Sequence, residues 1–110
     1  MTDNLDPIVW IYTTLPSQDH ADTIADHLIG NRLAACVNML PGMIAVYEWN
    51  GVIERGQEIA CFFKTAKHRA VEAIDAIKAQ HPYETPAILI FEADGASENY
   101  AAWIRRQTAN

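Results

Sequence analysis

The chain has 110 residues, half of them hydrophobic, and a formal net charge of −6 at neutral pH. A chain of this length buries about 65% of its unfolded surface, which suffices for one core, so we expect a single domain over residues 1–110. The negative charge repels phosphate backbones and excludes the usual nucleic-acid binder, which carries clustered lysine and arginine side chains.

The chain also lacks the sequence features of a membrane or secreted protein. No stretch approaches the roughly 18 apolar residues that a membrane span needs, and residues 1–6 hold no basic or apolar signal region. Cys36 and Cys61 are too few for a disulfide scaffold, and their apolar neighbours are typical of buried strands. We therefore expect two reduced thiols in a soluble, cytoplasmic protein with no membrane or nucleic-acid partner.

The first third of the chain predicts a strand followed by a helix. Residues 8–12 form a nearly continuous apolar run, which is typical of a strand covered on both faces. Ser17 is a suitable N-cap, and Asp19 is well placed beside the positive end of the helix. Apolar residues then recur at helical spacing as far as Gly30, which supplies the C-terminal stop.

Two strands joined by a hairpin follow. We expect the first over residues 34–40, with a break at Pro41-Gly42 and an apolar continuation over residues 43–49. Asn50-Gly51 indicates a tight hairpin, because a type I′ turn needs positive φ at both central residues. Residues 57–65 form the returning strand, so the second and third strands pair directly.

The last third predicts a helix, a strand and a short final helix. Ala70, Ala73 and Ile77 share one face of the first helix, which ends at His81 because a residue before proline is displaced from the helical region. Residues 87–91 form the fourth strand, and Ser97 is a suitable cap for the last helix.

The resulting order is βαββαβ with a C-terminal helix. A direct hairpin between the second and third strands excludes a doubly wound parallel sheet, so we predict an α+β, ferredoxin-like sandwich. Such a sheet has helices on one face only, and the apolar strands leave the other face in need of cover by further copies of the chain. The extended hairpin adds Tyr47, Trp49 and Val52 to the surface expected to lie between copies.

Five short stretches resemble the CutA family. They are Arg32-Leu33-Ala34-Ala35-Cys36-Val37-Asn38, Leu40-Pro41-Gly42, Tyr47-Glu48-Trp49-Asn50-Gly51, Lys64-Thr65 and His81-Pro82-Tyr83-Glu84-Thr85-Pro86. The resemblance implies a ferredoxin-like homotrimer similar to PII signalling proteins, linked to tolerance of divalent metals and to copper binding. Tyr100 and Trp103 match the aromatic character of the family's last helix, and we assign Trp103 to the trimer interface, whereas residues 93–97 depart from the common pattern.

Cys36, His81 and Glu84 are the candidate metal ligands. One thiol, one imidazole and one carboxylate from a single chain make a poor site unless a neighbouring subunit brings them together, which would create a mixed N/O/S site for copper or another divalent ion. The structural alternative is that Cys36 is a small buried apolar residue, that His81 caps its helix and that Glu84 anchors the turn.

Two further functions have residue-level support. A PII-like sensor would hold a small anionic metabolite in a cleft between subunits, with Arg32, Lys64 and Tyr83 as contacts and Asn38 facing the same cleft. An enzyme would use Cys36 as the nucleophile, with His81 as the base and Glu84 as the group that orients it, but a thiol within a strand lacks the surroundings that lower its pKa. We therefore expect a binding protein rather than an enzyme.

Overall fold

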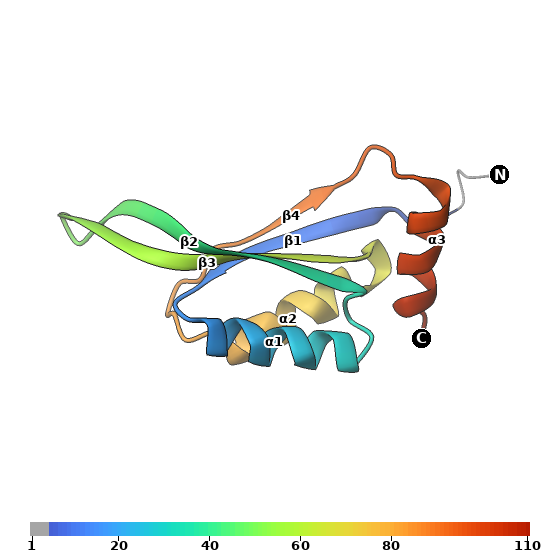
Figure 1. Ribbon diagram of the computed structural model, residues 1–110, viewed down its shortest axis with the longest axis horizontal. Helices are drawn as coiled ribbons and strands as arrows, with labels where there is room; N and C mark the ends of the chain where they lie inside the picture. Colours follow the sequence, from blue (N-terminus) through green and yellow to red (C-terminus); the bar gives the residue numbers. More distant parts are fainter. Residues whose placement is uncertain (1–4) are drawn as a thin grey trace.

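The computed structural model describes residues 5–110 (Figure 1). Residues 1–4, which enter the expectations about the N-terminal region and the domain bounds, lie outside the described part. The elements in chain order are β1 (Ile8–Leu15), α1 (Gln18–Gly30), β2 (Cys36–Trp49), β3 (Val52–Ala66), the 3₁₀ turn η2 (Lys67–Arg69), α2 (Ala70–Gln80), β4 (Ile88–Glu92) and α3 (Glu98–Gln107).

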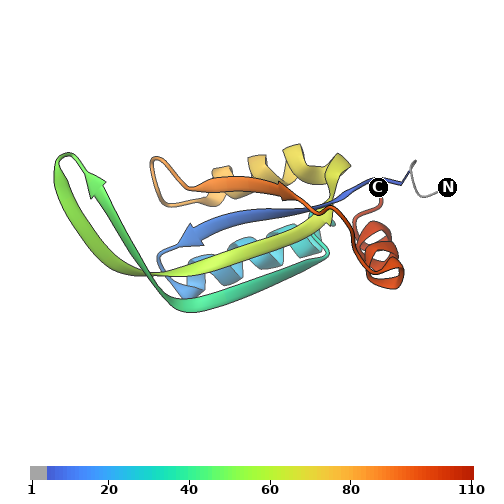
Figure 2. The same ribbon diagram turned by 90° about the horizontal axis from the view of Figure 1, so that it is seen from above.

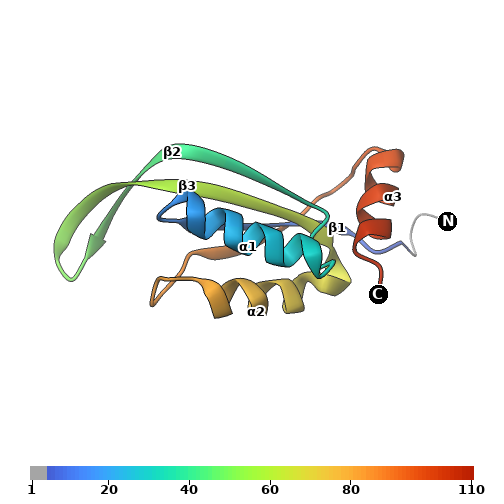
Figure 3. The same cartoon turned by 60° about the horizontal axis from the view of Figure 1, so that its bottom comes forward.

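The four strands form one antiparallel sheet in the order β2-β3-β1-β4. Helices α1 and α2 lie side by side on the same face of this sheet, and α3 stands at one end of it (Figures 2 and 3). The α+β, ferredoxin-like prediction is confirmed. None of the described helices is long and apolar enough to cross a membrane.

The helix-covered face carries the main core. Alternate residues of β1 point towards the helices, and apolar residues at helical spacing on α1 and α2 meet them. Each fully buried large side chain contributes about 1.5–3 kcal/mol through the hydrophobic effect. The central members are Ile11, Leu15, Ile24, Leu28, Phe63, Ala73 and Ile77.

The opposite face of the sheet is apolar and has no helix over it. The register aligns Trp10 with Phe91 and Tyr12 with Phe62 on this side, and Leu40 and Phe91 are 59% and 52% exposed. We call this surface the helix-free face; it comprises Trp10, Tyr12, Leu40, Phe62, Leu89 and Phe91. Its existence confirms the expectation of an uncovered apolar face.

Strands β2 and β3 run far beyond the rest of the sheet and give the molecule its length of 52 Å. The register shifts between Leu40 and Met43, where Gly42 has φ +77°, and the paired strands continue to the turn at Asn50 (φ +52°) and Gly51 (φ +82°). We call this projecting hairpin, residues 43–58, the arm. The turn confirms the predicted hairpin, since both central residues have positive φ.

Several predicted bounds were wrong. Strand β2 begins at Cys36 rather than residue 34, because the chain turns at Arg32 (φ +59°) and buries Ala34 and Ala35 in two separate clusters. It also continues through Pro41-Gly42 instead of breaking there, since an edge strand tolerates a proline at a bulge. Long-range pairing extends the returning strand, which begins at Val52 rather than residue 57.

The caps follow the sequence more closely. The Ser17 hydroxyl accepts the His20 backbone N–H at 3.2 Å, and α2 ends at His81 as expected. Ser97 occupies the N-cap position of α3, but its side chain makes no capping hydrogen bond. Helix α3 is instead held by Ala101 and Ile104, which pack against Ile8 and Ala35.

Candidate functional site

The predicted metal ligands lie at opposite ends of the sheet. Cys36 pairs with Lys64 at the start of β2, whereas the His81 imidazole contacts Thr14, whose partner on β3 is Ala60. Four residues of β3 correspond to about 13 Å, so one chain does not bring Cys36 and His81 together. Within residues 5–110, no cluster of three or more His, Cys, Asp or Glu side chains is arranged to hold a metal ion.

His81 uses both ring nitrogens to fasten the turn after α2. Nε2 lies 2.8 Å from the Thr14 carbonyl oxygen and 3.1 Å from the Thr13 hydroxyl, and Nδ1 accepts the Tyr83 backbone N–H at 3.2 Å. A carbonyl only accepts, so Nε2 carries the proton. Burial lowers the pKa of His81, although the bond to Thr14 and the charge of Glu58 act in the opposite direction. Metal coordination by this ring would require release of one of these bonds.

The loop after α2 also joins the arm. The Tyr83 hydroxyl donates to Oε2 of Glu58 at 2.7 Å, and its ring lies 4.9 Å from the His81 imidazole. Burial and the bond to Glu58 raise the pKa of Tyr83 well above its usual range. Glu84 is exposed on the same loop. Tyr83 therefore connects the predicted ligand His81 to β3.

Arg32 and Lys64 lie beside α3, far from Tyr83. The Arg32 guanidinium donates to the carbonyls of Arg106 and Ala109 at 2.6 and 3.2 Å, which stabilises the negative end of α3. Lys64 donates to the Tyr100 hydroxyl at 3.1 Å, with its ammonium 5.3 Å from the ring centre. One chain thus does not gather Arg32, Lys64 and Tyr83 into one cleft.

The remaining predicted residues lie at the surface, where Trp103 is partly buried and the others are exposed. Asn38 pairs with Phe62 and is exposed on the side of the sheet without helices. Trp103 stacks on Tyr100 at 5.9 Å, and Tyr47, Trp49 and Val52 are about half exposed. Cys36 and Cys61 are both free, and burial raises the pKa of Cys61 to about 11, with a further contribution from Asp22. The Cys61 thiol is therefore kept protonated and unreactive.

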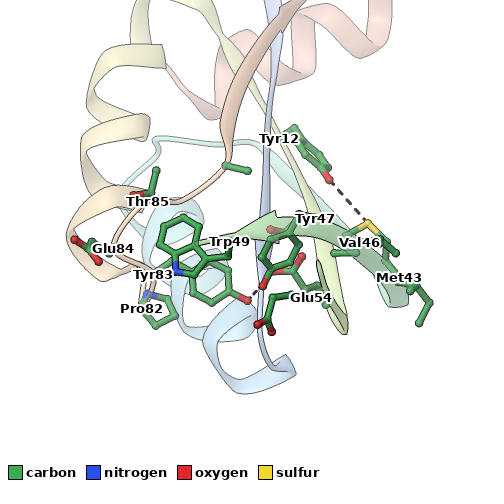
Figure 4. Close-up of a pocket in the computed structure, with 15 residues that line it drawn as sticks. Tyr12, Met43, Val46, Tyr47, Trp49, Glu54, Pro82, Tyr83, Glu84 and Thr85 are labelled. Carbon is green, nitrogen blue, oxygen red and sulfur yellow. Dashed lines mark hydrogen bonds between the residues drawn. The ribbon is translucent and has the colours of Figure 1, made fainter. Parts of the chain in front are cut away.

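Beyond the end of the sheet the arm bends towards the loop after α2 (Figure 2), and the two segments border an open cavity of about 790 Å³. Figure 4 shows Tyr47, Trp49 and Glu54 of the arm and Tyr83 of the loop projecting towards the space between them. We call this space the arm cavity. Its principal lining residues are Tyr12, Thr14, Met43, Tyr47, Trp49, Glu54, Glu58, Pro82, Tyr83, Glu84 and Thr85.

The sequence pointed to four of the residues that line this cavity but assigned them to other sites: Tyr47 and Trp49 to the trimer interface, Tyr83 to a cleft between subunits and Glu84 to the metal ligands. These four residues come from two of the motif stretches, which are about thirty positions apart in the chain and meet here. Glu54 and Glu58 were missed, although the hairpin register carries a signal for them. Counting outwards from the Asn50-Gly51 turn places Glu54 opposite Tyr47 and Glu58 opposite Met43, because the register is unbroken over this part of the hairpin and shifts only between Met43 and Leu40.

Known proteins resemble this chain over nearly its whole length. The family model described as CutA1 divalent ion tolerance protein matches residues 9–107. The divalent-cation tolerance protein CutA of Thermus thermophilus is 37% identical over 89% of this chain and 95% of its own, and that of Pectobacterium atrosepticum is 34% identical over 87% of each. The crystal structure of CutA1 from Ehrlichia chaffeensis superposes with a TM-score of 0.93 at 33% identity, covering 97% of this chain and all of the other.

Proposed function

Because the chain belongs to the CutA1 divalent ion tolerance family, we propose that it acts in tolerance of divalent metal ions as a homotrimer assembled over the helix-free face. The observation that carries the assembly is the helix-free face, whose apolar residues come from all four strands and are exposed or partly exposed. Surfaces of this kind mark interaction sites. The number of copies rests on the family resemblance to PII-like trimers.

The proposed ligand is copper or another divalent ion, held between subunits by Cys36 of one copy and by His81 and Glu84 of the next. A cyclic trimer uses a head-to-tail interface, in which different surfaces of two copies meet. Cys36 and His81 lie at opposite ends of the strands, so such an interface is the arrangement that could join them. Coordination at Nδ1 of His81 would replace its bond to the Tyr83 amide.

Metal titration tests this site. We expect Cys36→Ala and His81→Ala each to weaken copper binding by at least tenfold, because each removes one of three donors. His27→Ala is the matched control, since His27 is exposed on α1, away from both candidate ends. Unchanged affinity in both ligand variants would eliminate the intersubunit site while leaving the family assignment intact.

The alternative is a PII-like sensor of a small anionic metabolite. The arm cavity offers poor support for it, because Glu54 and Glu58 line the cavity and an anion would be repelled. The cationic groups Arg32 and Lys64 lie at the other end of the sheet, where α3 already engages them. A thermal-shift screen of nucleotides and organic acids tests this alternative. Stabilisation of the protein by any of these compounds would favour the sensor function.

We further propose a cytoplasmic location and a binding rather than enzymatic role. Two free thiols, one of them fully buried, suit a reducing compartment. The family is named for tolerance of ions and not for a reaction. Cell fractionation with a compartment marker tests the location.

A further inference from the structure

The arm cavity combines aromatic rings with carboxylates on one face of a hairpin. Alternation along β2 places Met43, Ala45, Tyr47 and Trp49 on the same side, and their partners on β3 include Glu58 and Glu54. Tyr47 lies directly opposite Glu54, and Trp49 is the diagonal neighbour of Glu54. The ring and the carboxylate are therefore within reach of one ligand.

Small residues at the middle of this face leave room for a ligand. Ala45 pairs with Gly56 between the larger Met43 and Tyr47 positions. A Cβ atom added at Gly56 would have no heavy atom within 4 Å. The volume of about 790 Å³ lies in the range of small-molecule sites, and Tyr12 and Tyr83 border the cavity from the other side.

The charged residues that line the cavity are all acidic. Glu54, Glu58 and Glu84 are among its lining residues, and none of the fifteen residues that line it carries a positive side chain. Tyr83 occupies Oε2 of Glu58, and within residues 5–110 no hydrogen bond engages Oε1. The bond from Tyr83 holds the Glu58 carboxylate in place without neutralising it.

We propose that the arm cavity binds a small organic cation, an alkylated ammonium with an apolar body. The faces of Tyr and Trp rings attract such cations, carboxylates balance the charge, and the aromatic walls accommodate the carbon substituents. A bare divalent ion fits less well, because the described residues provide no converging set of three donors here. The arm cavity shares Glu84 with the proposed metal site, but the proposal rests on the rings and carboxylates of the arm, which take no part in that site.

The test is calorimetric titration of the metal-free, chelator-treated protein with three probes that share a benzyl or phenyl ring. We expect benzyltrimethylammonium to bind, neutral benzyl alcohol to bind at least tenfold more weakly, and benzoate not to bind. Only the first compound carries a positive charge that both the aromatic rings and the carboxylates attract. The proposal would be overturned if benzyl alcohol bound as tightly as benzyltrimethylammonium, or if the ammonium did not bind at millimolar concentration. The second outcome includes the case in which a side chain of a neighbouring copy fills the cavity.

Variants locate the binding site. Glu54→Gln and Trp49→Leu are exposed changes on the arm and should each raise the dissociation constant of benzyltrimethylammonium about fivefold or more. Glu98→Gln removes one negative charge from α3, away from the cavity, and should change this dissociation constant less than twofold. Equal affinity in Glu54→Gln, Trp49→Leu and the parent would place the ammonium elsewhere and reject the arm cavity. Copper affinity measured on the same variants should not change, which separates this proposal from the metal site.

Discussion

The Tyr83 hydroxyl donates to the Glu58 carboxylate at 2.7 Å and so joins the loop after α2 to the base of the arm. The two residues are 25 positions apart in the chain. Their hydrogen bond links the side chains of these two segments directly. It fixes one wall of the arm cavity relative to the other. Changes at this pair should therefore affect both stability and the shape of the cavity.

We expect Tyr83→Phe to lower the free energy of unfolding by about 1 kcal/mol, because it leaves the half-buried Glu58 carboxylate without its donor. Urea denaturation at fixed protomer concentration measures the change. Glu58→Ala, which removes the acceptor, should cost less in the Tyr83→Phe background than in the parent, since the shared bond is already lost. Strictly additive losses would show that the bond contributes nothing to stability.

His81 should make unfolding depend on pH in the mildly acidic range. Burial lowers the pKa of the folded imidazole below its ordinary value of 6.5, so between these two values the unfolded chain binds more protons. Stability from this group is complete above pH 6.5 and falls as the pH drops towards the folded pKa. Urea midpoints at about pH 7.5 and pH 5.5 should therefore differ more for the parent than for His81→Gln.

The matched control for that measurement is His27→Gln on the exposed side of α1. It should keep the pH dependence of the parent, since its side chain is not buried. If His81→Gln retained the full difference between the two midpoints, the acid sensitivity would belong to other groups.

Arg32→Ala should loosen α3. The guanidinium donates to two carbonyls at the C-terminal end of the helix, and we expect a loss of about 1 kcal/mol and faster amide exchange throughout α3. Arg32→Gly removes the same bonds but suits the positive φ of 59° better, so it should be less destabilising than Arg32→Ala. Arg55→Ala on the arm is a matched exposed arginine and should leave α3 exchange unchanged.

Phe91→Asp should shift the native mass towards the monomer, because it places a charge on the helix-free face, at a half-exposed aromatic position of the edge strand β4. Val71→Asp is the control: Val71 is 73% exposed on α2, away from the proposed interface, and its replacement should leave the mass unchanged. Native mass spectrometry distinguishes the two. A folded monomer in the parent protein at working concentration would contradict the assembly itself.

The sequence by itself determined the order and type of the elements. Helical spacing on α1 and α2, the cap at Ser17 and the Asn50-Gly51 turn act over a few residues, so their consequences can be read locally. The direct hairpin then left a ferredoxin-like sheet as the simple topology, and the continuous apolar character of β1 indicated a face without helices. These features follow from short-range rules.

Tertiary structure alone decided where the chemical groups meet. Strand β2 passes through Pro41-Gly42 because pairing with β3 on both sides of the bulge supports it, and this long-range pairing creates the arm. The same register separates Cys36 from His81 and assigns Arg32 to the end of α3, whereas it gathers Tyr47, Glu54, Glu58 and Tyr83 around one cavity. Alternation along a strand tells which residues share a face, but only the pairing of distant segments determines what that face encloses.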